Sequence, residues 1–131
     1  MSSIFLVDDQ PYMQYFLKGE LAEMGHVLKW LQSGESLLLE LEENRPDLVL
    51  LDLFIDGLAG WTLLGDIKRR DQWIPVILLT AYDNFSNDAR LSHAQGYIIK
   101  SIDTTDLRNK IAAVLASSVV KRAQGVSRVS P

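Results

Sequence analysis

Acidic, hydroxyl and lysine side chains close several short apolar runs of this sequence, and together they could carry out phosphoryl chemistry. Asp8 and Asp9 follow the first apolar run, Asp52 follows a later one, and Thr80 and Lys100 close two more. Clustered carboxylates repel one another unless a proton or a cation lies between them. Mg²⁺ accepts one or two carboxylates together with waters and phosphate oxygens, and a lysine ammonium and a threonine hydroxyl both suit phosphoryl oxygens.

This set of side chains favours transfer of a phosphoryl group onto a carboxylate over hydrolysis by a serine–histidine–aspartate triad, because no histidine belongs to it. Taken singly, each residue is more often a helix cap, a turn residue or a surface lysine. Their matching places at the ends of successive apolar runs favour one shared site, because ligands of an open parallel sheet bind beyond the carboxyl ends of its strands.

The elements that would position these residues alternate between strand and helix patterns. Apolar runs at 4–7, 48–51 and 76–79 indicate strands buried on both faces, and weaker runs at 27–31 and 97–99 indicate two more. Four amphipathic helices are expected, with apolar faces at Met13, Phe16, Leu17, Leu21 and Met24; at Leu37, Leu38 and Leu41; at Leu63, Leu64 and Ile67; and at Leu107, Ile111, Val114 and Leu115. A fifth, short helix is expected within the polar residues 84–94.

The pattern predicts an α/β fold, a doubly wound (βα)5 unit with a five-stranded parallel sheet. We expect one domain over residues 1–118 and a tail or linker over 119–131. The 131 residues are 47% hydrophobic and 23% charged, which excludes a mainly disordered chain. With a net charge of −4, no cysteine and no long apolar stretch, we expect a cytoplasmic protein that binds neither nucleic acid directly nor a membrane.

Four segments, in this order, resemble the receiver domains of response regulators in two-component signalling, including the chemotaxis regulators. They are Phe5–Asp9, Pro46–Leu53, Ile74–Ala81 and Tyr97–Lys100. The resemblance extends from residue 4 to about residue 117. It implies a flavodoxin-like fold with strand order 2-1-3-4-5, which accepts a phosphoryl group from a phosphohistidine donor in a Mg²⁺-dependent reaction and then switches conformation.

The resemblance also implies roles for individual residues at the reacting centre. Asp52 is the expected phosphoacceptor, and Lys100 is expected to pair with a phosphoryl oxygen. Asp9 is expected to bind Mg²⁺ directly and Asp8 largely through water. Phe54 would offer its main-chain carbonyl to the same ion.

A second group of residues would form the switch. Thr80 is expected to bond a phosphoryl oxygen and to move toward it, and Ala81 leaves room beside it. Tyr97 stands at the position of the aromatic residue that swings inward. Phe54 and Tyr82 are bulky at positions that tune access of water, from which we expect slow dephosphorylation.

Three departures from the family pattern affect the switch and the signalling surface. Ser101 replaces the usual proline after the lysine, and a cis bond before serine would cost roughly 3 kcal/mol. The loop at 55–60 lacks a proline and adds Asp56. The residues before the last strand, at 92–94, read Ser-His-Ala instead of the usual Ala-Gly-Ala.

Expected partners are a sensor histidine kinase or phosphotransfer protein and an output domain or downstream protein, and a homodimer is left open. The chain is not expected to be an enzyme beyond its own phosphorylation and dephosphorylation.

The main alternative is a degenerate receiver that acts only as an interaction module. A Mg²⁺-dependent phosphatase fits less well because Phe54 stands where its second aspartate would be. A nucleotide or flavin carrier fits less well still, because no glycine-rich phosphate loop follows the first predicted strand. Trp30 and Trp73 are interpreted as packing residues, and Trp61 as packing or a partner contact.

Overall fold

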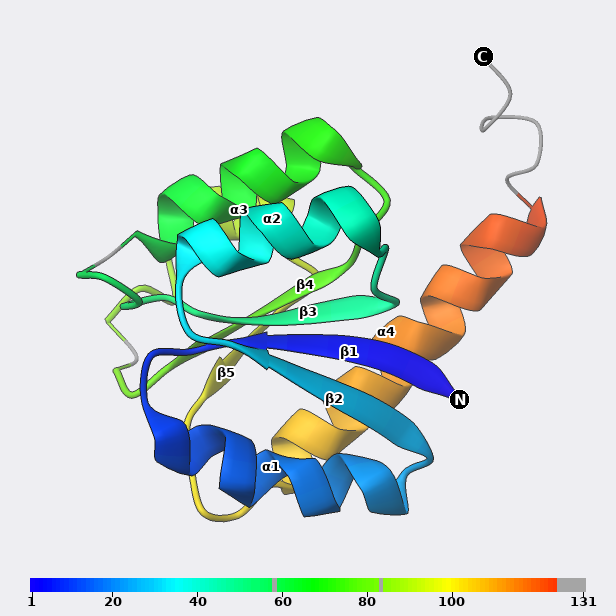
Figure 1. Cartoon of the computed structure of the whole chain (residues 1–131), viewed down its shortest axis with the longest axis horizontal. Helices are drawn as coiled ribbons and strands as arrows, with labels where there is room; N and C mark the ends of the chain where they lie inside the picture. Colours follow the sequence, from blue (N-terminus) through cyan, green and yellow to red (C-terminus); the bar gives the residue numbers. More distant parts are fainter. Residues whose placement is uncertain (58, 83, 125–131) are drawn as a thin grey trace.

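The computed structural model, which describes residues 1–57, 59–82 and 84–124 with side chains through residue 118, is a five-stranded parallel sheet between two layers of helices (Figure 1). The strand order is β2-β1-β3-β4-β5, which confirms the expected fold class and order. The strands are β1 (Ser2–Val7), β2 (His26–Leu31), β3 (Leu48–Asp52), β4 (Val76–Thr80) and β5 (Gly96–Ile99). The helices are α1 (Pro11–Glu23), α2 (Gly34–Glu43), α3 (Gly60–Arg70), η1 (Ala89–His93) and α4 (Thr105–Gln124).

Two separate cores form on the two faces of the sheet. Helices α2 and α3 cover one face, and α1 and α4 cover the other (Figure 1). Every residue of β3 and β4 is buried, because these strands lie inside the sheet and meet helices on both sides. This double burial explains why their sequences are continuous apolar runs instead of alternating ones.

The connection between β4 and β5 contains the short helix expected within residues 84–94. It is η1, a 3-10 helix of five residues, and the other four helices of the described chain are α-helices. The Asp88 side chain begins η1 by accepting a hydrogen bond from Arg90 N at 2.9 Å. Phe85 and Leu91 are the large apolar residues of this stretch. They do not form a stripe at helical spacing, so a longer helix would have little apolar face to bury.

Helix α4 runs past the expected domain boundary at residue 118 and ends at Gln124. Its last turns extend past the end of the sheet at which β1 begins (Figure 1). Residues 125–131, the rest of the expected tail or linker, lie outside the described residues, so that assignment stays a prediction. In the part of the chain that the structure describes, no helix is both long and apolar enough to cross a membrane.

The start of α3 lies directly on the chain that follows β3. Gly60 N donates to Leu53 O at 3.2 Å. A Cβ atom on Gly60 would lie 2.6 Å from Leu53 Cα and 2.8 Å from Asp52 O, closer than real Cβ contacts. Glycine is therefore needed here by close approach of two backbones, and the contact fixes the loop beside Asp52.

We predict opposite effects for two glycine-to-alanine changes. Gly60→Ala should lower the free energy of unfolding by about 1–3 kcal/mol, because the added methyl has no space. Gly19→Ala is the matched control, because Gly19 is exposed within α1 and a Cβ there meets nothing within 4 Å. That change should raise the free energy of unfolding by roughly 0.5–1 kcal/mol through helix propensity. Urea unfolding followed by circular dichroism measures both, and equal midpoints for Gly60→Ala and the wild type would contradict the close-approach argument.

Candidate functional site

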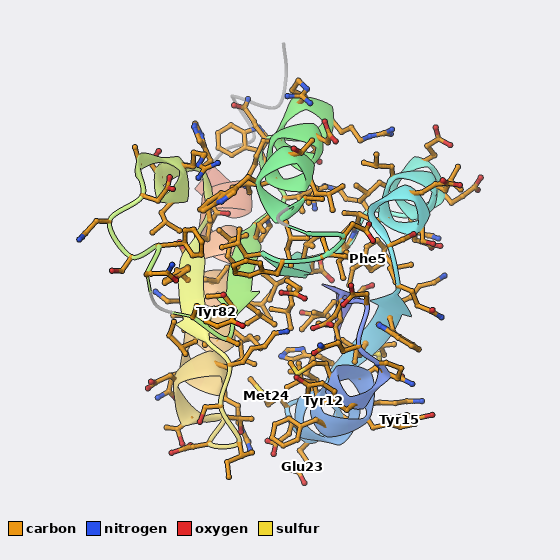
Figure 2. All side chains as sticks on the ribbon, turned by 90° about the vertical axis from the view of Figure 1, so that its left-hand side faces the viewer. Phe5, Tyr12, Tyr15, Glu23, Met24 and Tyr82 are labelled. Carbon is orange, nitrogen blue, oxygen red and sulfur yellow. The ribbon has the colours of Figure 1, made fainter. Side chains whose placement is uncertain are left out.

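Three carboxylates meet where β1 and β3 end, at the edge of the sheet that faces the viewer in Figure 2. One oxygen from each of Asp8, Asp9 and Asp52 lies within 4.8 Å of the others. The strand register explains this arrangement. Val7 of β1 pairs with Leu51 of β3, and the residue that follows each of them is an aspartate, Asp8 or Asp52. Asp8 is completely buried and Asp52 is 5% exposed, whereas Asp9 faces solvent.

Lys100 brings a positive charge to these carboxylates from the end of β5. Its Nζ lies 3.0 Å from Asp8 Oδ2 and 3.5 Å from Asp52 Oδ2, and its side chain is 13% exposed. Lys100 N also donates to Thr80 O at 2.7 Å, which ties the start of the following loop to β4. The peptide bonds of the described chain are all trans. Ser101 in place of proline therefore does not keep the ammonium from reaching the aspartates.

Burial and pairing shift the proton affinities of the two central groups. Burial raises the pKa of the Asp52 carboxyl above its usual value, and the nearby Lys100 and the hydrogen bond from Phe54 N at 3.1 Å offset this only in part. For Lys100, burial acts to lower the pKa, but the charges of Asp52 and Asp8 outweigh it and raise the pKa above its usual value. Lys100 is therefore protonated at neutral pH, and an ionised Asp52 carries a desolvation cost.

The donor atoms of this cluster fit a hard divalent cation. All three side chains offer carboxylate oxygens, the ligand type that Mg²⁺ prefers, and no histidine takes part. The expected fourth ligand, Phe54 O, accepts a hydrogen bond from Gly57 N at 3.1 Å, so its binding to metal stays a prediction. The additional acid Asp56 is exposed and lies outside the cluster.

The expected switch residues lie along the neighbouring strand ends. Thr80 is fully buried, and its Oγ1 accepts a hydrogen bond from Tyr82 N at 3.2 Å. Tyr97 is half-buried in β5, and its hydroxyl donates to Tyr82 O at 2.9 Å. Ala81, between Thr80 and Tyr82, is exposed. Main-chain atoms of Tyr82 thus join the threonine to the aromatic residue.

Four aromatic rings connect the loop after Asp52 with the segment after β4. Phe54 lies edge-on to Tyr82 with centroids 5.3 Å apart, and Phe85 lies 5.6 Å from Phe54 and 6.2 Å from Trp61. The Arg90 guanidinium stands 4.1 Å above the Trp61 ring. Trp61 therefore packs within the protein, and the interpretation that it also contacts a partner stays a prediction. The sequence pattern did not single out Phe85 or Arg90, because their partners lie on distant elements.

The sequence profile of the response regulator receiver domain matches residues 4–112 of the chain. The transcriptional regulatory protein AfsQ1 of Streptomyces coelicolor is 37% identical over 117 residues, which cover 88% of this chain and 52% of AfsQ1. The chain therefore spans about half the length of the curated relatives it matches.

Solved structures give the same result for the fold. The response regulator protein TrrA of Thermotoga maritima, crystallised with Mg²⁺ and BeF, superposes with a TM-score of 0.81 at 32% identity. The superposition covers 87% of this chain and 99% of TrrA. TrrA in complex with the histidine kinase ThkA also matches, with a TM-score of 0.81 at 33% identity over 88% of this chain and 99% of TrrA.

The raised pKa of Asp52 predicts a pH-dependent gain in stability for Asp52→Asn. A carboxyl whose pKa is higher in the folded than in the unfolded chain contributes stability below the unfolded pKa and loses it as the pH rises through the folded pKa. In EDTA, the variant should therefore melt a few degrees above the wild type at neutral pH, with a gap that shrinks as the pH falls toward about 4. Thermal unfolding measures this, with Asp56→Asn as the control that removes an acid outside the cluster. A variant less stable than the wild type at neutral pH would refute the desolvation argument.

Proposed function

The chain belongs to the response regulator receiver domains, and we propose that it accepts a phosphoryl group on Asp52 from a phosphohistidine donor. An Asp52 carboxylate oxygen attacks phosphorus, an O–P bond forms, and the P–N bond to the donor imidazole breaks. The electron pair of that bond stays on the imidazole nitrogen. The observation that carries the proposal is the meeting of Asp8, Asp9 and Asp52 with the Lys100 ammonium at one edge of the sheet.

Mg²⁺ is the cofactor that the site fits. We propose that Asp9 and Asp52 would bind it directly, Asp8 largely through water, and Phe54 through its carbonyl. When bound, the ion supplies positive charge to the phosphoryl oxygens and the acceptor carboxylate, which otherwise repel each other. Lys100 contributes a second positive charge, since its ammonium already lies within 3.5 Å of Asp52 Oδ2.

The switch would begin at Thr80. Its hydroxyl now accepts a hydrogen bond from Tyr82 N, and bonding a phosphoryl oxygen instead would require it to turn. The exposed Ala81 leaves room for that movement. Since Tyr82 O also accepts a hydrogen bond from the Tyr97 hydroxyl, a shift of this segment would release the Tyr97 ring. A phosphoryl group adds about 1.5–2 negative charges, enough to bias such a segment.

The proposed partners are a sensor histidine kinase or phosphotransfer protein and an output domain or downstream protein, with homodimer formation as a further proposal. The solved complex of TrrA with ThkA supports the first. Apolar residues suited to a donor surface flank the edge of the sheet. Tyr12 and Tyr15 of α1 (Figure 2) and Ile102 after β5 are 57%, 75% and 91% exposed. We propose that the chain catalyses only its own phosphorylation and dephosphorylation.

Intact-mass spectrometry after incubation with acetyl phosphate tests the phosphoacceptor. We expect one added phosphoryl group in Mg²⁺, none in EDTA and none in Asp52→Asn. Asp56→Asn, which changes an acid outside the cluster, should be modified like the wild type. If no adduct forms at any Mg²⁺ concentration, the chain is an interaction module instead, with Ser101 and the loop at 55–60 as the first residues to restore to the family pattern.

The contact between Phe54 and Tyr82 predicts how long the phosphoryl group lasts. We propose that the two rings, 5.3 Å apart, limit access of water to Asp52, so Tyr82→Ala should speed dephosphorylation about two- to tenfold, the equivalent of an aromatic contact of ~0.5–1.5 kcal/mol. Decay of the phosphorylated mass after removal of acetyl phosphate gives the rate. Trp73→Ala removes a partly exposed ring at the opposite end of β4 from Thr80 and should leave the rate of dephosphorylation unchanged. Loss of phosphate from Tyr82→Ala no faster than from the wild type would show that the rings only cover the loop.

A further inference from the structure

Trp30, in the edge strand β2, makes a contact that packing does not require. Its indole Nε1 donates a hydrogen bond of 2.7 Å to the main-chain carbonyl of Asp8. Trp30 pairs in register with Leu6 of β1, and its ring packs against the core on the face of α1 and α4. One side of this residue therefore belongs to the core, while its N–H reaches the chain at the carboxylate cluster.

The carbonyl that Trp30 binds belongs to the peptide between Asp8 and Asp9. On the other side of Asp8, its N–H continues the ladder to β2 by donating to Leu31 O at 3.1 Å. Strand β2 ends at Leu31, so no further main-chain group of β2 is available to the Asp8 carbonyl. The Trp30 side chain of β2 binds that carbonyl instead. The Trp30 indole thus fixes the plane of the peptide from which Asp9 begins.

The two neighbouring aspartates depend on this peptide to different degrees. The Asp8 carboxylate is held at both oxygens, by Gln10 N at 2.8 Å and by Lys100 Nζ at 3.0 Å. The Asp9 side chain is exposed, and among the described residues no hydrogen bond or ion pair holds it. Its place beside Asp8 and Asp52 therefore comes from the main chain alone.

We propose that Trp30 is a positioning residue for the divalent cation site, which acts by orienting the Asp8–Asp9 peptide so that the Asp9 carboxylate lies beside Asp52. This inference rests on the proposed Mg²⁺-dependent function. Mg²⁺ demands nearly ideal octahedral geometry, so freedom in one ligand's main chain weakens binding. If Trp30 only packed against the core, a phenylalanine ring would serve equally well.

Calorimetric titration with Mg²⁺ separates these two roles. Trp30→Phe keeps a ring and removes the donor, and we expect the Mg²⁺ dissociation constant to rise about three- to tenfold, the usual effect of losing one hydrogen bond. Trp73→Phe is the control, because Trp73 is 40% exposed and precedes β4, at the opposite end of that strand from Thr80. It should bind Mg²⁺ like the wild type.

A kinetic readout distinguishes positioning from chemistry. The rate of phosphorylation by acetyl phosphate should fall in Trp30→Phe at low Mg²⁺ and return to the wild-type rate at saturating Mg²⁺, because the acceptor and Lys100 are unchanged. An unchanged dissociation constant in Trp30→Phe would overturn the inference and leave the proposed function standing. A wild type that binds no Mg²⁺ would overturn both.

A third variant covers the case in which Trp30→Phe folds poorly, as thermal unfolding without Mg²⁺ would show. Trp30→benzothienylalanine keeps nearly the shape of tryptophan and places sulfur where the N–H stands. The same loss of Mg²⁺ affinity in a fully folded protein would support the role of the N–H. Wild-type affinity with this residue would overturn it.

Discussion

The edge of the sheet depends on one ammonium group shared between two buried carboxylates. Lys100 Nζ lies 3.0 Å from Asp8 and 3.5 Å from Asp52, where opposite charges attract by roughly 5 kcal/mol at an effective dielectric constant near 20. With Asp9, the cluster holds three carboxylates against one ammonium. When all are ionised, two negative charges remain, which is the charge that a divalent cation neutralises. The lysine offsets part of the repulsion among the carboxylates, and the remaining negative charge favours a divalent cation.

The fold brings these charges together through contacts between distant parts of the chain. Parallel pairing of β1 with β3 places Asp8 beside Asp52, and the lysine reaches them from the carboxyl end of β5, the edge strand that β4 separates from β3. Gly60 lets α3 begin directly on the chain after Asp52, so the loop that follows this last residue of β3 has little freedom. The neighbouring connection between β4 and β5 contains the short helix η1, and the contacts of Phe85 with Phe54 and Trp61 join this connection to that loop and to the start of α3. Rigid strands thus hold the charges, while the less regular segment lies beside them.

The strands and the residues at their ends were predictable because both signals are local. A strand buried on both faces must be apolar throughout, so the polar residue that ends it is conspicuous, as at Asp52 and Thr80. The short helix at 84–94 was not predictable in detail, because a polar segment takes its shape from distant partners, here the packing of Phe85 and Arg90 around Trp61. The need for glycine at position 60 was hidden for the same reason, since the atoms that exclude a side chain belong to β3 and its following loop.

Trp30 shows why a pattern of hydrophobicity can assign a residue correctly and still miss part of its role. An indole ring buries apolar carbon and also carries one N–H donor, and the sequence shows only that it is large and apolar. The donor matters here because the three aspartates are held unequally. Asp8 is held at its main chain and at both carboxylate oxygens. Asp52 accepts a hydrogen bond from Phe54 N and lies near Lys100, whereas the Asp9 side chain is positioned by its backbone. A divalent cation that entered this site from solvent would meet the exposed Asp9 first, so its binding would depend on how firmly the Asp8–Asp9 peptide is held.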